Sequence, residues 1–234
     1  MSKYIFLNQV KDFHREIEND ENGRYKSWEY CYSEFCKARE KGSKDLEHLS
    51  LHLAFYLASW GMYRGSSFLL KKDYKVHIPV VKEILKKKYN VLAGIKCADF
   101  MDNWSTYIEL YNNLKDYYSD VRSDVTNSKS DISSTLITKV LMGTLGCVPA
   151  YDRFFALGVK SEGVTSGYHS KKSLEKLVEF YLKKENKKVL DKVIFKTEDD
   201  DLYPQMKILD MGFWEMGRKI DEEIKKTKKA EKSE

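Results

Sequence analysis

Apolar residues recur at helical spacing along most of the chain, and strict alternation of apolar and polar positions is rare. The spacing predicts helices over residues 11–19, 27–41, 46–60, 80–89, 98–121, 131–142, 149–157, 170–184 and 204–226. Residues 189–195 fit either a helix end or a short strand. Twelve Gly and three Pro are few for 234 residues, which disfavours a turn-rich β fold. The sequence therefore predicts an all-α, multi-helix globular fold of about eight to ten helices.

Particular residues mark where several of these helices begin. Pro79, Pro149 and Pro204 each fit the first turn of a helix, where the missing N–H costs no hydrogen bond. Ser43 fits the N-cap of the helix over residues 46–60. These residues predict four helix starts.

The helix over residues 46–60 has apolar residues on more than one side. One stripe consists of Leu46, Leu49, Leu53, Leu57 and Trp60. Because Phe55 and Tyr56 lie on the opposite flank, we expect the helix to be buried on most sides and central to the fold. His48 and His52 are four residues apart, as two metal ligands on one helix face would be, but no acidic cluster nearby in sequence completes a site. We interpret both as hydrogen-bonded core histidines and predict no metal site.

The chain length fits one large domain or two small lobes. Residues 119–130 are rich in Asp, Ser, Thr and Asn, which is typical of a linker. The sequence therefore predicts an N-terminal helical lobe over residues 1–118 and a C-terminal lobe over residues 131–234, packed together or forming one continuous domain.

Composition and charge narrow the class of protein. Hydrophobic residues at 42% and charged residues at 33% fit an ordered globular chain. The net charge of +5 is compatible with nucleic-acid binding, but only seven of the 41 basic residues are Arg, which also fits a solvated Lys-rich surface. No apolar run reaches the ~18 residues of a membrane span, and the first residues do not resemble a signal peptide, so we expect a cytoplasmic protein without a membrane partner. The four Cys form no CxxC pair, so we predict that they are reduced. The sequence contains no Walker loop, Rossmann fingerprint or nucleophile elbow, so we predict no cofactor.

The first candidate site is the string from Trp60 to Ser67, in which two glycines flank an aromatic residue and an arginine. A ligand-binding interpretation lets Arg64 bind an anionic group, Trp60 or Tyr63 stack on a ring, and Ser66 donate a hydroxyl. The structural interpretation is a C-cap glycine with Arg64 bound to carbonyl or carboxylate oxygens.

The second candidate site is a helix carrying Lys139, a glycine-containing turn, and a second helix with Asp152 in its first turn. If Lys139 and Asp152 converge on one cleft, the amine could act as a nucleophile or phosphate contact and the carboxylate could stabilise a cation. Tyr151 and Arg153, on either side of Asp152, are then candidate ligand-binding residues. The structural alternative is a surface lysine and a helix-capping aspartate.

Residues 134–154 resemble a known family. Thr138-Lys139, a short apolar stretch, Val148-Pro149 and Asp152 are similar to the segment joining the catalytic Lys and Asp of helix-hairpin-helix (HhH-GPD) DNA glycosylases. The resemblance implies that Lys139 attacks the sugar C1′ while Asp152 assists departure of a flipped base. It also implies an all-helical, two-lobed fold with DNA in the cleft.

Two functional hypotheses follow. The first is a helical protein that binds nucleic acid or a nucleobase-like ligand in a cleft formed by both candidate sites, with any activity resembling that of a glycosylase. The second is a non-enzymatic interaction module, such as a homodimer, whose aromatic helices form the contact surface. The first hypothesis requires Arg64 and Asp152 to face a common cavity.

Overall fold

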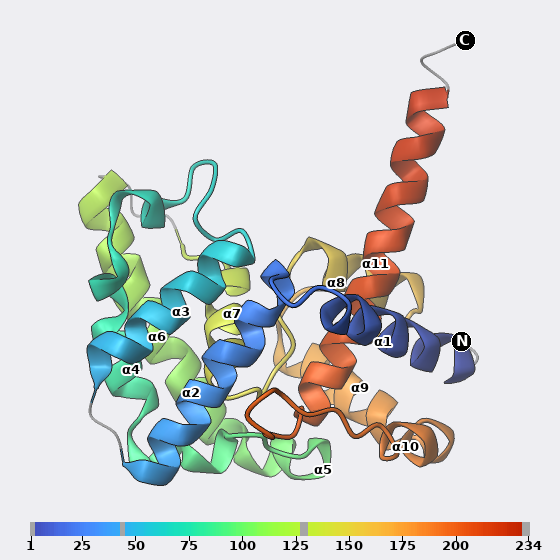
Figure 1. The fold of residues 1–234 in the computed structure, drawn as a ribbon, viewed down its shortest axis with the longest axis horizontal. Helices are drawn as coiled ribbons and strands as arrows, with labels where there is room; N and C mark the ends of the chain where they lie inside the picture. The colour runs from blue at the N-terminus through green and yellow to red at the C-terminus, as the bar shows by residue number, and fades with distance from the viewer. Residues whose placement is uncertain (1–2, 43–44, 127–130, 231–234) are drawn as a thin grey trace.

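The computed structural model describes residues 3–42, 45–126 and 131–230 and is helical nearly throughout (Figure 1). Within these residues lie eleven α-helices: α1 (Lys3–Glu18), α2 (Ser27–Lys41), α3 (Leu46–Ser59), α4 (Ile78–Ile84), α5 (Cys97–Phe100), α6 (Trp104–Thr126), α7 (Ser134–Thr144), α8 (Arg153–Ser161), α9 (Lys171–Leu182), α10 (Lys184–Leu190) and α11 (Gln205–Ala230). Extended pairing in the described part of the chain is limited to one bridge between Lys196 and Leu202. The all-α prediction is confirmed.

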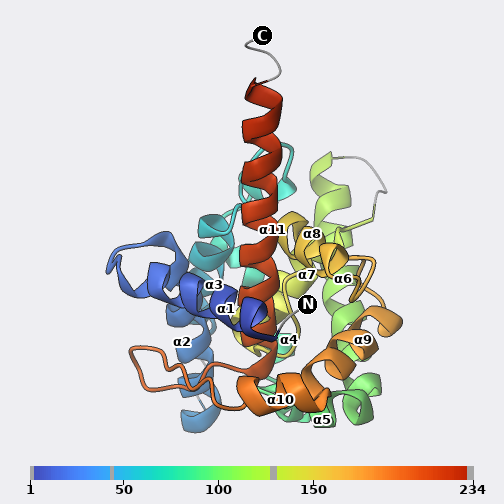
Figure 2. The same cartoon turned by 90° about the vertical axis from the view of Figure 1, so that its right-hand side faces the viewer.

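Helix α7 lies at the centre of the molecule (Figure 1). Every residue of α7 from Leu136 to Thr144 is buried, including Thr138 and Lys139. Helices α2, α3 and α6 pack against α7, and α11 lies between α1 and α8 (Figure 2). The buried side chains form one continuous core, to which residues on both sides of the 119–130 segment contribute. The candidate residues on α7 are therefore positioned from all sides.

Two glycines allow α8 and α11 to approach closely. A Cβ atom built on Gly158 of α8 would collide with the carbonyl oxygen of Phe213, and one on Gly217 of α11 with the carbonyl oxygen of Phe154. The backbones thus touch where larger residues would keep them apart. These two contacts hold α8 against α11, whose last turns project beyond the body of the protein (Figure 2).

Some predicted element boundaries are wrong. Helix α6 runs through residues 119–126, so this part of the proposed linker is helical. No helix starts at Pro149, because α8 begins only after Asp152, whose side chain caps it. Pro79 does lie in the first turn of α4, and Pro204 immediately precedes α11.

The expected surroundings of α3 also need correction. Ser43 lies outside the described residues, and the N-cap of α3 is Asp45, which accepts a hydrogen bond from the backbone N–H of His48. One side of α3 faces solvent, where Leu51 and Phe55 are more than half exposed, so α3 is not buried on most sides. No helix in the described ranges has the length and apolar composition of a membrane span.

Candidate functional site

The C-terminal end of α3 forms the first wall of the candidate site. Gly61 has a positive φ of 78°, and its N–H donates to the carbonyl of Ala58 while the N–H of Met62 donates to that of Leu57. These two bonds define a Schellman motif, so the C-cap interpretation of this glycine is right. A Cβ atom on Gly61 would lie 3.0 Å from Nε of Arg64, which shows that the arginine folds back over the glycine. The same turn therefore ends the helix and positions Arg64.

Lys139 connects this turn to α8. Its Nζ donates to the carbonyl oxygen of Trp60 at 2.8 Å and lies 3.1 Å from Oδ2 of Asp152. The ammonium also lies 5.6 Å from the centre of the Trp60 ring. Lys139 is only 4% exposed, so the surface-lysine interpretation is wrong. A cation at the C-terminal end of α3 also complements the negative end of the helix dipole.

Asp152 uses both carboxylate oxygens. Oδ1 accepts from the backbone N–H groups of Phe154 and Phe155, each at 3.1 Å, which makes Asp152 the N-cap of α8. Oδ2 accepts from Nε1 of Trp214 at 3.2 Å, in addition to its contact with Lys139. The capping interpretation of Asp152 is therefore right, and the same carboxylate also forms a buried ion pair.

These residues surround a pocket of about 340 Å³. Its lining residues come from the short 3-10 helix before α2, the end of α3 and the turn after it, α7, the start of α8 with its N-cap, and α11: Arg24, Ser59, Trp60, Gly61, Met62, Arg64, Thr135, Lys139, Asp152, Arg153, Phe154 and Trp214. Arg64 and Asp152 thus face the common cavity that the first hypothesis requires. Four of the twelve lining residues are basic and one is acidic. The pocket is consequently electropositive, with aromatic side chains in its wall.

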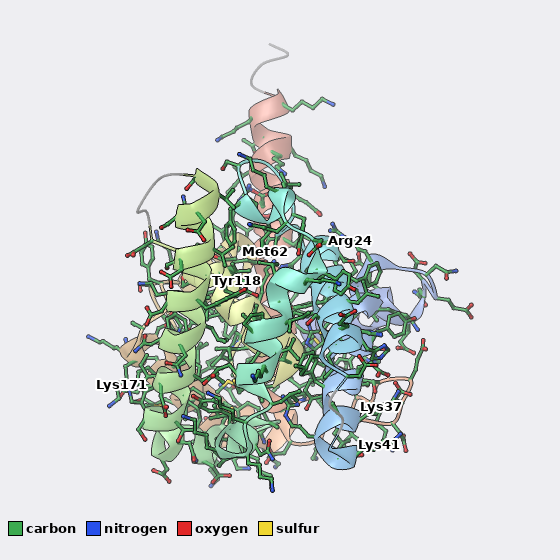
Figure 3. All side chains as sticks on the ribbon, turned by 90° about the vertical axis from the view of Figure 1, so that its left-hand side faces the viewer. Arg24, Lys37, Lys41, Met62, Tyr118 and Lys171 are labelled. Atoms are coloured by element: carbon green, nitrogen blue, oxygen red, sulfur yellow. The ribbon has the colours of Figure 1, made fainter. Side chains whose placement is uncertain are left out.

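Three arginines contribute to this pocket. Arg24 donates to the hydroxyl of Tyr25 at 3.1 Å, and Arg153 pairs with Asp221 on α11. No carboxylate in the described ranges forms an ion pair with Arg64. Arg24 and Met62, which both line the pocket, mark its position in the upper half of the view in Figure 3.

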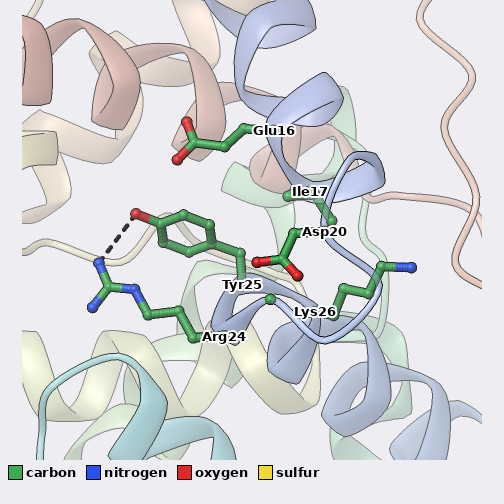
Figure 4. Close-up of a pocket in the computed structure, with 7 residues that line it drawn as sticks. Glu16, Ile17, Asp20, Arg24, Tyr25 and Lys26 are labelled. Atoms are coloured by element: carbon green, nitrogen blue, oxygen red, sulfur yellow. Dashed lines mark hydrogen bonds between the residues drawn. The ribbon is translucent and has the colours of Figure 1, made fainter.

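A second pocket shares Arg24 with the first (Figure 4). Its volume is similar, about 350 Å³, but Glu16 and Asp20 lie in its wall together with Arg24 and Lys26. The equal number of acidic and basic side chains makes this pocket less suited to an anion than the first one.

Three predicted ligand-binding residues do not line the electropositive pocket. The hydroxyl of Tyr63 is hydrogen-bonded to Nε2 of His77 at 2.7 Å, so its side chain belongs to a different contact. The hydroxyl of Tyr151 is hydrogen-bonded to Ser173 at 2.9 Å inside the core. Ser66 is exposed in the turn after Arg64. Trp60, Arg64, Lys139, Asp152 and Arg153 are brought together; Tyr63, Ser66 and Tyr151 are not.

Sequence reasoning missed a second buried ion pair near the pocket wall. Nζ of Lys207 lies 3.3 Å from Oδ2 of Asp210, and 4.6 and 5.1 Å from the ring centres of Trp28 and Trp60. Burial lowers the pKa of Lys207 and raises that of Asp210. Trp60 therefore lies close to the Nζ atoms of two buried lysines, Lys139 and Lys207.

Two further lining residues, Arg24 and Trp214, were not predicted as site residues. Arg24 is more than thirty positions from any predicted site residue, and only the fold brings it to the pocket. Trp214 follows the core stripe of its helix, so its hydrogen bond to Asp152 leaves no signal in the sequence.

Comparison with protein-family models, with curated proteins and with solved structures finds no match to this chain. A functional assignment therefore depends on the site itself.

Proposed function

We propose that this protein binds nucleic acid and accommodates one nucleotide in the pocket between α3, α7 and α8. The observation that supports this most strongly is the convergence of Arg24, Arg64 and Arg153, from three distant segments, on a pocket with aromatic walls. Arginine suits phosphate oxygens because its guanidinium donates two parallel hydrogen bonds. The single carboxylate that lines the pocket, Asp152, is already paired with Lys139. Arg153 pairs with Asp221 outside the pocket, but its side chain is 65% exposed and remains accessible to a ligand.

The aromatic part of the pocket suits a base or sugar ring. Trp60 and Phe154 are half-buried and line the pocket, and Trp214 packs edge-on against both. Stacking on such rings is tolerant of base identity and contributes about 1–3 kcal/mol for each base. A volume of about 340 Å³ is near the lower end for small-ligand pockets, which favours a single nucleotide over a larger ligand.

The proposal is for binding rather than bond cleavage. In the glycosylase-like mechanism Lys139 would attack as a neutral amine. Its Nζ is instead engaged by the Trp60 carbonyl at 2.8 Å and the Asp152 carboxylate at 3.1 Å, so these two contacts occupy the amine that would have to attack. Lys139 and Asp152 are therefore assigned to holding the pocket walls together, with DNA as the partner that the helix-hairpin-helix resemblance favours.

Fluorescence anisotropy with labelled single-stranded and duplex DNA tests this proposal. We expect Arg64→Gln and Arg153→Gln each to weaken binding about 5- to 10-fold and to reduce the slope of log affinity against log salt concentration by about one. The matched control is Lys82→Gln, which removes one exposed positive charge from α4, outside the pocket. Equal weakening by Lys82→Gln, or no binding at about 50 mM salt, would overturn the proposal.

The aromatic contribution needs a separate variant. Phe154→Leu keeps an apolar side chain beside Trp214 but removes the half-buried aromatic ring from the pocket wall. We expect at least about a 5-fold loss of affinity, corresponding to one stacked base, with an unchanged salt slope. A reduced salt slope, or unchanged affinity, would contradict a stacked base at this position.

A further inference from the structure

A second cluster of chemically active side chains lies on the outer surface of α2 and α3. His48 and His52 project from the same side of α3, with ring centres 4.5 Å apart. Glu34 of α2 reaches them, and its Oε2 lies 2.9 Å from Nε2 of His48. One ligand atom from each residue lies within 4.8 Å of the other two. The carboxylate that joins the two histidines thus comes from the neighbouring helix α2 and not from the residues next to them in sequence.

The surroundings of these histidines do not fit the core interpretation. The His48 side chain is 47% exposed, and His52 is half-buried. The backbone N–H of His48 donates to the N-cap residue Asp45, which fixes the first turn of α3, and the contact with Glu34 orients the His48 ring.

We propose that Glu34, His48 and His52 bind one divalent transition-metal ion, with Zn²⁺ as the occupant that this donor set fits best. Two imidazole nitrogens and one carboxylate oxygen are typical zinc ligands, and the exposed side of the cluster leaves a coordination position for water. Ligand atoms around tetrahedral zinc lie ~3.3 Å apart at bonds of ~2.0 Å. The Glu34 and His48 ligand atoms, 2.9 Å apart, need to separate by only about 0.4 Å to reach this spacing, and rotation of the His52 side chain would close the triangle.

A neighbouring cation sets a limit on the affinity. Nζ of Lys37 lies 2.8 Å from Oε1 of Glu34 and 2.9 Å from Oδ2 of Asp199. Lys37 therefore occupies the carboxylate oxygen that does not face His48, and its charge opposes that of the metal ion. In Figure 3 it lies on the lower part of α2, well below Arg24. The metal cluster and the nucleic-acid pocket are thus separate sites.

Calorimetric titration of chelator-treated, tag-free protein with Zn²⁺ tests the proposal. We expect one Zn²⁺ per chain, and at least tenfold weaker binding for His48→Gln, His52→Gln and Glu34→Gln. Lys37→Gln should bind Zn²⁺ several-fold more tightly, because it removes the competing cation. Undetectable binding in the wild type, or unchanged binding in the two histidine variants, would overturn the proposal.

Two control variants exclude other donors. His169→Gln makes the same exchange at a histidine that contacts Tyr107 and Tyr111 of α6 instead of the cluster, and it should leave Zn²⁺ binding unchanged. Cys36→Ser removes the one cysteine that is not fully buried in the core, and it too should leave binding unchanged. Loss of binding in either control would assign the metal to other residues and refute this site. Co²⁺ substitution provides a second readout, since a site with two nitrogen ligands and one oxygen ligand should give visible absorption that both histidine variants lose.

Discussion

Replacing Lys139 by Met is the most direct test of how the pocket is held together. The substitution keeps an apolar stem of similar length in the interior but removes the ammonium. The Trp60 carbonyl then loses its donor from Lys139, and Asp152 loses its cationic partner. The Asp152 side chain is 15% exposed, so the unpaired carboxylate remains largely shielded from water.

The size of the effect follows from these contacts. Removing one partner of a buried ion pair costs about 3–5 kcal/mol. Asp152 retains three donors, the N–H groups of Phe154 and Phe155 and the indole of Trp214, which offsets part of this cost. We therefore expect Lys139→Met to lower the free energy of unfolding by about 2–4 kcal/mol.

Urea denaturation followed by both tryptophan fluorescence and far-UV circular dichroism measures this change, and coincident curves establish two-state unfolding. Asp152→Asn retains a capping side chain, so it serves as the partner in a double-mutant cycle. The double variant should lose at least about 1 kcal/mol less than the sum of the two single losses. A loss below about 0.5 kcal/mol for Lys139→Met, or additive effects, would refute the reasoning.

Two further predictions concern packing and pH. Gly217→Ala should destabilise the protein by more than about 2 kcal/mol, because the added Cβ would collide with the Phe154 carbonyl. The higher helix propensity of alanine offsets only part of this loss. A melting temperature within error of the wild type would contradict this prediction. Burial lowers the pKa of His169 to about 4. At pH values between this pKa and the ordinary pKa of histidine, the unfolded chain binds a proton at His169 that the folded protein does not bind. The free energy of unfolding therefore falls as the pH falls through this range. Between about pH 7.5 and about pH 5, the free energy of unfolding measured by urea denaturation should fall by about 2 kcal/mol less in His169→Gln than in the wild type. Equal decreases in the two proteins would show that His169 is not the titrating group.

Apolar spacing predicted the helices well because most of them bury one face. It failed where a helix is buried on all sides or bears an apolar residue on its exposed side. In α7, residue type alone predicts that Lys139 lies on the surface, yet Lys139 is buried like its neighbours Leu136 and Val140. In α3, Phe55 reads as a core position but is 56% exposed. Residue type gives a preference for burial, and the packing of neighbouring helices decides it.

The candidate sites were predictable only as far as their residues are near in sequence. The turn after α3 and the Lys139 and Asp152 hairpin are local patterns, and the pocket contains both. Arg24 and Trp214 join the pocket only through tertiary packing. The same holds for Glu34, which meets His48 and His52 because α2 packs against α3. A short connection between two helices favours this neighbouring arrangement, but it does not predict which side chains will meet.

The two helix ends at the pocket explain how a buried ion pair and an electropositive surface coexist. The ammonium of Lys139 lies at the C-terminal end of α3 and the carboxylate of Asp152 at the N-terminal end of α8, so each charge faces the helix end of opposite sign. The pair is thus neutralised by its own contacts and by backbone dipoles. Because Asp152 is occupied in this way, it does not neutralise Arg64, and the rim of the pocket retains the positive charge that an anionic ligand would bind.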